Sequence, residues 1–267
     1  MNSDLVNDNL VNHIASSFVN ARIAQSCINA YPGPIPESLQ EAYRIQDRAI
    51  QLISQEIIGW KIGRIPANLT ATFGDQFLSG PVFHRNLHFA NPSQTHLVNA
   101  FKGGFCAVEG EVIFQIGHDA DPTIRDWNAD TIKTLIDSSH IGIEIAGSPF
   151  QGINDHGPAV TVSDFGNNQS LLVGPKIADG CLNREVTVRC ALRYDDALKG
   201  QGSTQADSNG CFGALSWLAN HLAARALPLK KGQWITTGAI AGVHAIGVGQ
   251  LAEVSFDSIG TLKCLVE

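Results

Sequence analysis

The chain has 267 residues, of which 44% are hydrophobic and 16% charged, and its formal net charge is -7 at pH 7. This balance excludes an intrinsically disordered chain, and the acidic charge argues against a nucleic-acid partner, because phosphates are neutralised by a basic surface. No signal-peptide core and no run of 18 apolar residues occurs, so we expect a cytoplasmic protein without a membrane partner.

The first 56 residues are predicted to form two helices. Apolar residues recur along the first helix at three- to five-residue spacing: Leu5, Leu10, Ile14, Phe18 and Ala21. The Pro-rich segment 31–36 breaks this helix, and Pro36 suits the first turn of a second helix over Glu37–Gln55.

From residue 57 onward, short apolar runs and frequent glycines indicate strands. The predicted strands are Ile57–Ile62, Val108–Ile116, Ile141–Ala146, Leu171–Val173, Val186–Tyr194, Trp234–Thr237, Val243–Val248, Ala252–Phe256 and Thr261–Val266. Two more helices are expected, at about Ala129–Ser138 and Gly213–Ala226. The sequence therefore predicts an α+β fold with a single domain over residues 1–267, in which residues 1–56 pack on a mixed β core formed by residues 57–267.

Two glutamates lie in the apolar, β-branched segment Val108–Phe114. Side chains alternate between the faces of a strand, so Glu109 and Glu111 are predicted to point the same way. Two buried carboxylates repel each other, and a cation relieves the repulsion. Hard oxygen ligands of this kind suit Mg²⁺, Mn²⁺ or Ca²⁺. The alternative is an exposed strand face with two solvated glutamates.

A third carboxylate, Glu144, lies in the apolar segment Ile141–Gly147, which holds no Lys or Arg to pair with it. A buried acid needs a partner from elsewhere in the fold, and the alternative is an edge-strand glutamate that faces water. Three carboxylates from two such strands can hold one octahedral ion and leave about three positions for water or substrate. We therefore predict Glu109, Glu111 and Glu144 as metal ligands.

Two further segments carry candidate site residues. Lys61 is the one cation of the apolar run Gly59–Gly63, where burial would lower its pKa and make it a usable base. The alternative is a lysine whose ammonium group stays in water. Thr237 and Gly238 end a strand, where a hydroxyl and backbone N–H groups can bind a substrate carboxylate; the alternative is a plain turn.

The order and spacing of these motifs resemble the hydratase/decarboxylase branch of the fumarylacetoacetate hydrolase superfamily over nearly the whole chain. The segments that carry the resemblance are Glu41–Gln46, Gly59–Gly63, Glu109–Glu111, Glu144–Ser148, Thr237–Ala239 and Ser255–Thr261. The resemblance implies the mixed β-roll of the fumarylacetoacetase C-terminal region, with helices around it. We also expect a homo-oligomer.

The same resemblance implies the chemistry. The cofactor would be Mg²⁺ or Mn²⁺ on Glu109, Glu111 and Glu144, and a small 2-oxo acid would chelate the ion while Lys61 assists proton transfer. We predict a hydratase that acts on an unsaturated 2-oxo acid similar to 2-hydroxypentadienoate through a metal-stabilised enolate. The alternatives are a decarboxylase of a 2-oxo diacid similar to 4-oxalocrotonate, a C–C hydrolase of the fumarylpyruvate type, and a metal-binding relative without turnover.

Two segments depart from the pattern of that branch. Its members usually continue the lysine motif with Leu-Thr-Ser, whereas this chain has Arg64, Ile65 and Pro66, and they usually carry an acid just before the position of Gly80, where this chain has none. A turn after Lys61 would bring the Arg64 guanidinium over the pocket mouth, because Pro66 cannot continue a regular strand. Arg64 is therefore predicted to bind the distal carboxylate of a 2-oxo diacid; the alternative is a surface arginine.

Overall fold

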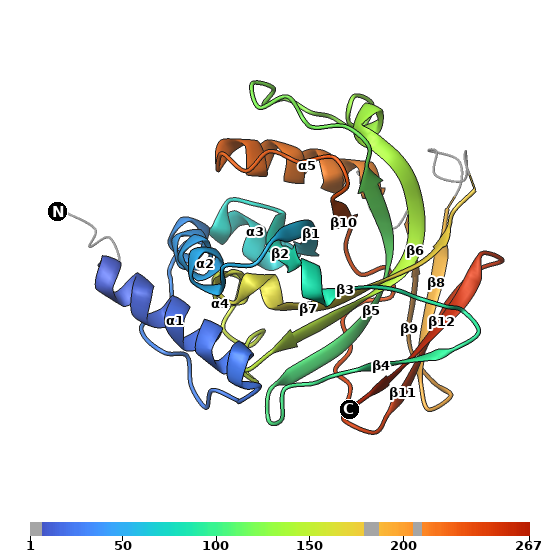
Figure 1. The fold of residues 1–267 in the computed structure, drawn as a ribbon, viewed down its shortest axis with the longest axis horizontal. Coiled ribbons are helices and arrows are strands. Elements are labelled where there is room, and N and C mark those ends of the chain that lie inside the picture. Colours follow the sequence, from blue (N-terminus) through green and yellow to red (C-terminus); the bar gives the residue numbers. More distant parts are fainter. Residues whose placement is uncertain (1–6, 179–186, 205–209) are drawn as a thin grey trace.

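The computed structural model describes residues 7–178, 187–204 and 210–267 and confirms the two N-terminal helices (Figure 1). Helix α1 spans Asp8–Ala24 and helix α2 spans Leu39–Ile53. Helix α2 begins where the Ser38 side chain accepts a hydrogen bond from the Glu41 N–H at 3.2 Å. Of the apolar residues predicted for the first helix, Leu5 lies outside the described residues. Within the described ranges, no helix is long and apolar enough to cross a membrane.

Two sheets form the predicted mixed β core, so the α+β fold is confirmed. The seven-stranded sheet has the order β2-β1-β10-β5-β6-β7-β3, with β1 (Ile57–Arg64), β2 (Phe77–Phe83), β3 (Leu87–Phe89), β5 (Phe105–Ile116), β6 (Ile136–Ser148), β7 (Asn168–Lys176) and β10 (Trp234–Thr236). The five-stranded sheet has the order β4-β12-β11-β8-β9, with β4 (Thr95–Val98), β8 (Arg189–Tyr194), β9 (Ala197–Ser203), β11 (Leu251–Phe256) and β12 (Gly260–Val266). The start of the strand predicted at Val186–Tyr194 lies outside the described residues, and the rest corresponds to β8.

Short helices connect these strands. They are α3 (Ala67–Phe73), α4 (Pro158–Ser163), α5 (Gly210–Ala224) and the 3₁₀ turns η1 (His84–Asn86), η2 (Ile132–Leu135) and η3 (Phe165–Asn167). Helix α5 is the one predicted at Gly213–Ala226, and its buried Leu215, Leu218 and Leu222 pack in the same core as the two sheets.

The long strands β5 and β6 curve strongly, with β8, β9, β11 and β12 on one side of the molecule and α1 and α2 on the other (Figure 1). A glycine allows β5 to approach the second sheet. A Cβ atom at Gly110 would come within 2.5 Å of the Cys190 Sγ and 2.6 Å of a Val254 methyl group. Because no side chain fits there, the face of β5 that carries Gly110 is packed shut, and the opposite face is left for a site.

The N-terminal helices pack against the seven-stranded sheet. Phe18 of α1 and Ile45 of α2 are fully buried in one cluster with Phe83 at the end of β2 and Phe165 of η3. Apolar burial of this kind stabilises the contact between the helices and the strands. The helices therefore support the segment around Phe165.

Three parts of the sequence prediction are corrected. The helix predicted at Ala129–Ser138 is wrong, because η2 ends after one turn and β6 begins at Ile136, where pairing with β5 outweighs local helix propensity. The strand predicted at Val243–Val248 is wrong: this segment makes one isolated bridge through Ala245 and is followed by Gly249 at φ 86°. Strands β2, β3, β4 and β9 were not predicted, and Pro81 of β2 is compatible with the place of that strand at the sheet edge.

Candidate metal centre

Three buried glutamates meet on one face of the seven-stranded sheet. Glu109 and Glu111 are two residues apart on β5, and Glu144 of β6 lies directly opposite Glu109 in the antiparallel register. Glu109 is 4% exposed, and Glu111 and Glu144 are fully buried. One carboxylate oxygen from each residue lies within 4.8 Å of the other two. The structure therefore brings together the three carboxylates that the sequence predicted, and it excludes the solvated alternative.

The cluster is electrostatically unfavourable without a cation. Burial raises the pKa of Glu109 to about 7, with Lys61 opposing the shift and Glu144 adding to it. Burial also raises the pKa of Glu111 well above its usual value, and the charges of Glu144 and Glu109 raise it further. A divalent cation would stabilise the ionised carboxylates and so oppose both shifts.

The oxygen atoms of the cluster fit a hard cation. Glu111 accepts a hydrogen bond from the Gly238 N–H at 2.6 Å through Oε2, whereas its buried Oε1 has no hydrogen-bond partner. Buried polar atoms are almost always satisfied, so the Oε1 atom fits the role of a metal ligand. Three carboxylates with a free oxygen form the donor set that Mg²⁺ and Mn²⁺ prefer.

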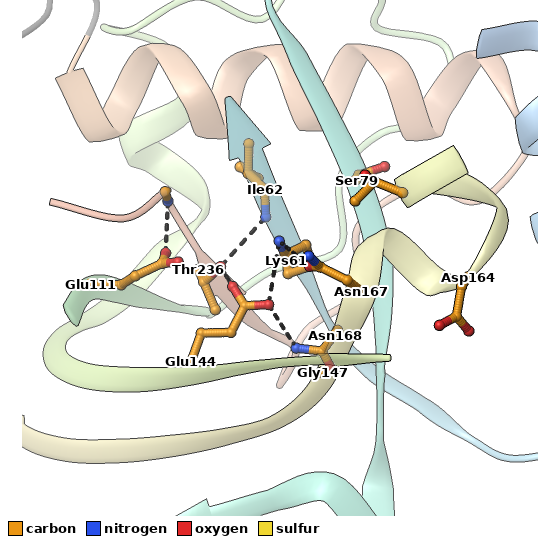
Figure 2. A network of polar contacts seen from close by, with 12 residues as sticks. Lys61, Ile62, Ser79, Glu111, Glu144, Gly147, Asp164, Asn167, Asn168 and Thr236 are labelled. Carbon is orange, nitrogen blue, oxygen red and sulfur yellow. Dashed lines mark hydrogen bonds and ion pairs between the residues drawn. The ribbon is translucent and has the colours of Figure 1, made fainter. Parts of the chain in front are cut away.

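Lys61 of β1 lies beside the carboxylates, as Figure 2 shows. Its Nζ is 3.4 Å from Glu144 Oε1 and donates to Asn167 Oδ1 at 3.2 Å, and the residue is 3% exposed. Burial lowers the lysine pKa, but the charges of the three glutamates outweigh burial and raise it above the usual value. The low exposure of Lys61 excludes the alternative of a lysine whose ammonium group stays in water. The prediction that its pKa is lowered is wrong, because the neighbouring carboxylates raise it.

Glu144 is held in place by two side chains. Asn168 Nδ2 donates to Oε1 at 3.0 Å, and the Thr236 hydroxyl donates to Oε2 at 3.3 Å (Figure 2). The Thr236 hydroxyl in turn accepts from the Ile62 N–H at 3.4 Å, which links β10 to the strand of Lys61. Hydrogen bonds of this kind from neighbouring side chains fix the orientation of a carboxylate that is to hold a metal ion.

In the turn after β10, the hydrogen-bonding groups predicted to bind substrate already have partners within the protein. The Gly238 N–H binds Glu111, and the Thr237 hydroxyl donates to the Val112 carbonyl at 2.9 Å. Both residues nevertheless line the cavity described below. Their predicted contact with a substrate carboxylate stays a prediction.

Asn167 contacts Lys61 and Asn168 contacts Glu144, although neither asparagine was among the predicted site residues. The only local signal is a Gly followed by two asparagines, which indicates a turn and gives no direction for the side chains.

A cavity of about 770 Å³ opens next to the carboxylates. Among its described lining residues the charged side chains are Lys61, Arg64 and Glu109. The amide and hydroxyl groups come from Asn154, Thr161, Asn167, Ser203, Thr204 and Thr237, and the larger apolar groups from Leu69, Phe77, Leu78, Phe105, Ile240 and Val243. The cavity is large enough for a small organic acid.

Arg64 lines this cavity, but the predicted turn at Gly63 is wrong. Strand β1 continues through Arg64, which pairs with Phe77 of β2, and its guanidinium carbon lies 5.1 Å from the centre of the Phe77 ring. The chain leaves the strand only at Ile65 and Pro66, before α3. Arg64 and Lys61 therefore reach the same cavity from one strand.

Comparison with known proteins supports the fold. No family model matches the chain. The 4-oxalocrotonate decarboxylase from Pseudomonas putida G7, complexed with magnesium and adipate, superimposes with a TM-score of 0.82 over 98% of each chain at 16% sequence identity. The fumarylpyruvate hydrolase from Pseudomonas aeruginosa, in complex with Mn²⁺ and pyruvate, gives a TM-score of 0.60 over 78% of this chain and 88% of its own, at 13% identity.

A third similar structure is the 5-carboxymethyl-2-hydroxymuconate delta-isomerase from Mycobacterium smegmatis, with a TM-score of 0.57 over 79% of this chain and 80% of its own, at 17% identity. The chain thus has the same fold as these three enzymes, and the mixed β-roll predicted from the sequence is confirmed. Of the three, the decarboxylase resembles this chain from end to end, including the N-terminal helices. These similarities establish the fold alone.

Proposed function

We propose that this protein is a divalent-metal enzyme that acts on a small 2-oxo acid. The observation that carries the proposal is the buried Glu109, Glu111 and Glu144 cluster, with its unpartnered Glu111 oxygen, beside a buried lysine and an open cavity. Two proteins of the same fold support it, since one was solved with magnesium and the other with Mn²⁺ and pyruvate, which is a 2-oxo acid.

Glu109, Glu111 and Glu144 would hold Mg²⁺ or Mn²⁺. When bound, such an ion supplies a Lewis acid that polarises the 2-oxo group and stabilises the enolate negative charge of the substrate. The protein keeps the ligands oriented: Asn168 and Thr236 fix Glu144, and the Gly238 N–H fixes Glu111.

Lys61 would hold and move the proton at Nζ. Three carboxylates, one ammonium group and one divalent cation sum to zero charge, so a protonated Lys61 is compatible with the loaded site. The ammonium group lies in the cavity wall between Glu144 and Asn167, where it can donate to a carbon of the substrate chain. Thr237 and Gly238, which line the cavity next to Glu111, would contact the substrate there.

For the reaction we propose hydration of an unsaturated 2-oxo diacid. Arg64 is the only cation, besides Lys61, among the described residues that line the cavity, and a guanidinium holds a carboxylate in bidentate fashion. A distal carboxylate paired with Arg64 is stabilised in the ground state. Such a carboxylate is therefore retained, and the bond change takes place at the carbon–carbon double bond.

Decarboxylation is the second candidate, and the apolar wall favours it. Leu69, Phe77 and Leu78 line the same cavity. A carboxylate placed against this wall instead of on Arg64 loses solvation, which favours the loss of CO₂. The two reactions thus differ in where the distal carboxylate lies.

Turnover of matched substrates separates these functions. Purified protein loaded with Mg²⁺ or Mn²⁺ would be given 2-oxo pentenoate and hexenedioate substrates, and products would be identified by mass spectrometry. Addition of one water without cleavage supports the hydratase, loss of CO₂ the decarboxylase, and hydrolytic cleavage of a carbon–carbon bond into two carboxylic acids the hydrolase. Metal binding without any turnover would contradict the proposal and identify a non-catalytic relative.

A further inference from the structure

The segment that joins α4 to β7 has an unusual backbone. Phe165, Gly166 and Asn167 have φ values of 54°, 62° and 56°, so three consecutive residues are left-handed. Two of them carry a Cβ atom, which disfavours this region. Such a conformation persists only where the surroundings impose it, and it is concentrated at functional sites.

Two neighbouring side chains of this turn reach different halves of the site. Asn167, 4% exposed, accepts from Lys61 through Oδ1 and donates to Asn154 Oδ1 at 3.3 Å through Nδ2. Asn168, 2% exposed, donates through Nδ2 to Glu144 at 3.0 Å. One asparagine therefore fixes the proton-carrying group, and the other fixes a metal ligand (Figure 2).

A buried ion pair anchors the turn on the N-terminal helix. Arg22 of α1 makes two hydrogen bonds to the Asp164 carboxylate, and it donates to the Asn168 and Gly147 carbonyls at 2.9 Å each. The Ser148 hydroxyl donates to Asp164 at 2.6 Å. Two carbonyls of the neighbouring strands β6 and β7 are thus tied to one guanidinium.

The other side of the turn rests on β2. A Cβ atom at Gly80 would come within 1.7 Å of the Phe165 carbonyl oxygen, and Gly80 is the register partner of Lys61. Only glycine allows the turn to approach the strands so closely. The left-handed backbone is therefore held both by the Arg22–Asp164 pair and by β2.

We propose that this left-handed turn is a positioning device with two separable arms. Asn168 orients Glu144 for the metal ion, and Asn167 orients the Lys61 ammonium group for proton transfer. The inference rests on the proposed metal-dependent function, and it makes two adjacent residues act on two different steps.

Two variants separate the arms. Asn167→Gly removes the amide and suits the left-handed backbone, so the turn is retained. Asn168→Ala removes the donor to Glu144 at an ordinary φ of -64°. Mn²⁺ affinity, measured by electron paramagnetic resonance, should fall roughly 10- to 100-fold in Asn168→Ala and stay within about 2-fold in Asn167→Gly. The kcat of metal-saturated Asn167→Gly should fall roughly 10- to 100-fold with an unchanged KM.

The outcomes are distinct. Equal losses of Mn²⁺ affinity in both variants, or none in Asn168→Ala, overturn the inference while wild-type binding upholds the proposed function. A wild type that binds no Mn²⁺ overturns both. Thermal melting checks that each variant folds, and Asn168→Ser, whose hydroxyl is too short to reach Glu144, replaces Asn168→Ala if that variant is unfolded.

Discussion

The two ends of the cavity are built differently. At the metal end, Glu109, Glu111 and Glu144 project from long, regularly paired strands whose register fixes their distances. At the end that Arg64 lines, which we call the distal end, β1 stops at Arg64 and gives way to α3, which contributes Leu69 to the cavity wall. Sheet pairing thus holds the carboxylates proposed to bind the metal ion, while a strand end and the short helix after it form the part proposed to meet the rest of the substrate. Connections tolerate change better than strands, so reactions of one chemical family can diverge at the distal end.

The largest expected effect lies at the metal end, in Lys61. Lys61→Met keeps most of the volume of the stem and removes the charge. Because Lys61 is buried beside Glu144, kcat should fall by roughly 10²–10⁴, the usual contribution of a positioned acid or base. Steady-state kinetics at saturating Mn²⁺ measure this change.

Lys230→Met provides the matched control, because Lys230 is exposed, pairs with Asp119 and does not line the cavity. Its kcat should match the wild type. An unchanged kcat in Lys61→Met would show that Lys61 has no role in proton transfer, and the three carboxylates would remain as the proposed functional groups.

A smaller and more selective effect is expected at the distal end. If Arg64 binds a second carboxylate, Arg64→Leu should lower kcat/KM for a 2-oxo diacid by roughly 10- to 150-fold, or about 1.5–3 kcal/mol. The matched monoacid should lose little, because it offers no partner to the guanidinium. Parallel kinetics on the two substrates test the prediction. A small, equal change for both would show that the distal end does not recognise charge through Arg64.

The smallest effect on activity is expected outside both ends, in α5, where a substitution changes the pH dependence of stability instead. Burial, with a contribution from the Arg225 charge, lowers the pKa of His221 to about 3, and its ring stacks on Trp217 at 4.8 Å. The unfolded chain takes up this proton below about pH 6.5, whereas the folded chain does not. The free energy of unfolding should therefore decrease by about 1.4 kcal/mol per pH unit as the pH falls from about 6.5 towards 3.

His221→Phe keeps a ring for the stack and removes the proton site. Urea unfolding of both proteins at about pH 6 and about pH 5 should show a shallower decrease in the variant. Parallel decreases would mean that His221 is protonated in the folded state. Metal-loaded activity at neutral pH should be unaffected in either case, because His221 does not line the cavity.

The pairing of Glu109 with Glu111 could be predicted from the sequence, because it depends only on the local alternation of side chains along a strand. Alternation alone places Glu109 and Glu111 on one face, although the position of Glu144 opposite Glu109 depends on a strand register that no local pattern specifies. Asn167 and Asn168 could not be predicted, since their directions depend on Arg22 and Gly80, which are far away in the chain.

The errors in the predicted secondary structure share one physical origin. Residues 136–138 have helix-compatible neighbours but join β6, because Ile136 and Ser138 pair with Ile116 and Gln115 of β5. Arg64 was placed in a turn because Pro66 follows, yet pairing with Phe77 keeps it in β1. Tertiary pairing outweighs local preference in each case.

Metal binding to the stripped protein tests the carboxylate assignment most directly. Mn²⁺ titration followed by electron paramagnetic resonance should find one tight site per chain in the wild type and in the control Glu253→Ala, whose carboxylate pairs with Lys263 on the second sheet. In Glu109→Ala the affinity should fall by at least about 100-fold, because a ligand is lost rather than merely reoriented. Unchanged Mn²⁺ affinity in Glu109→Ala, or no tight site in the wild type, would contradict the three glutamates as a metal centre.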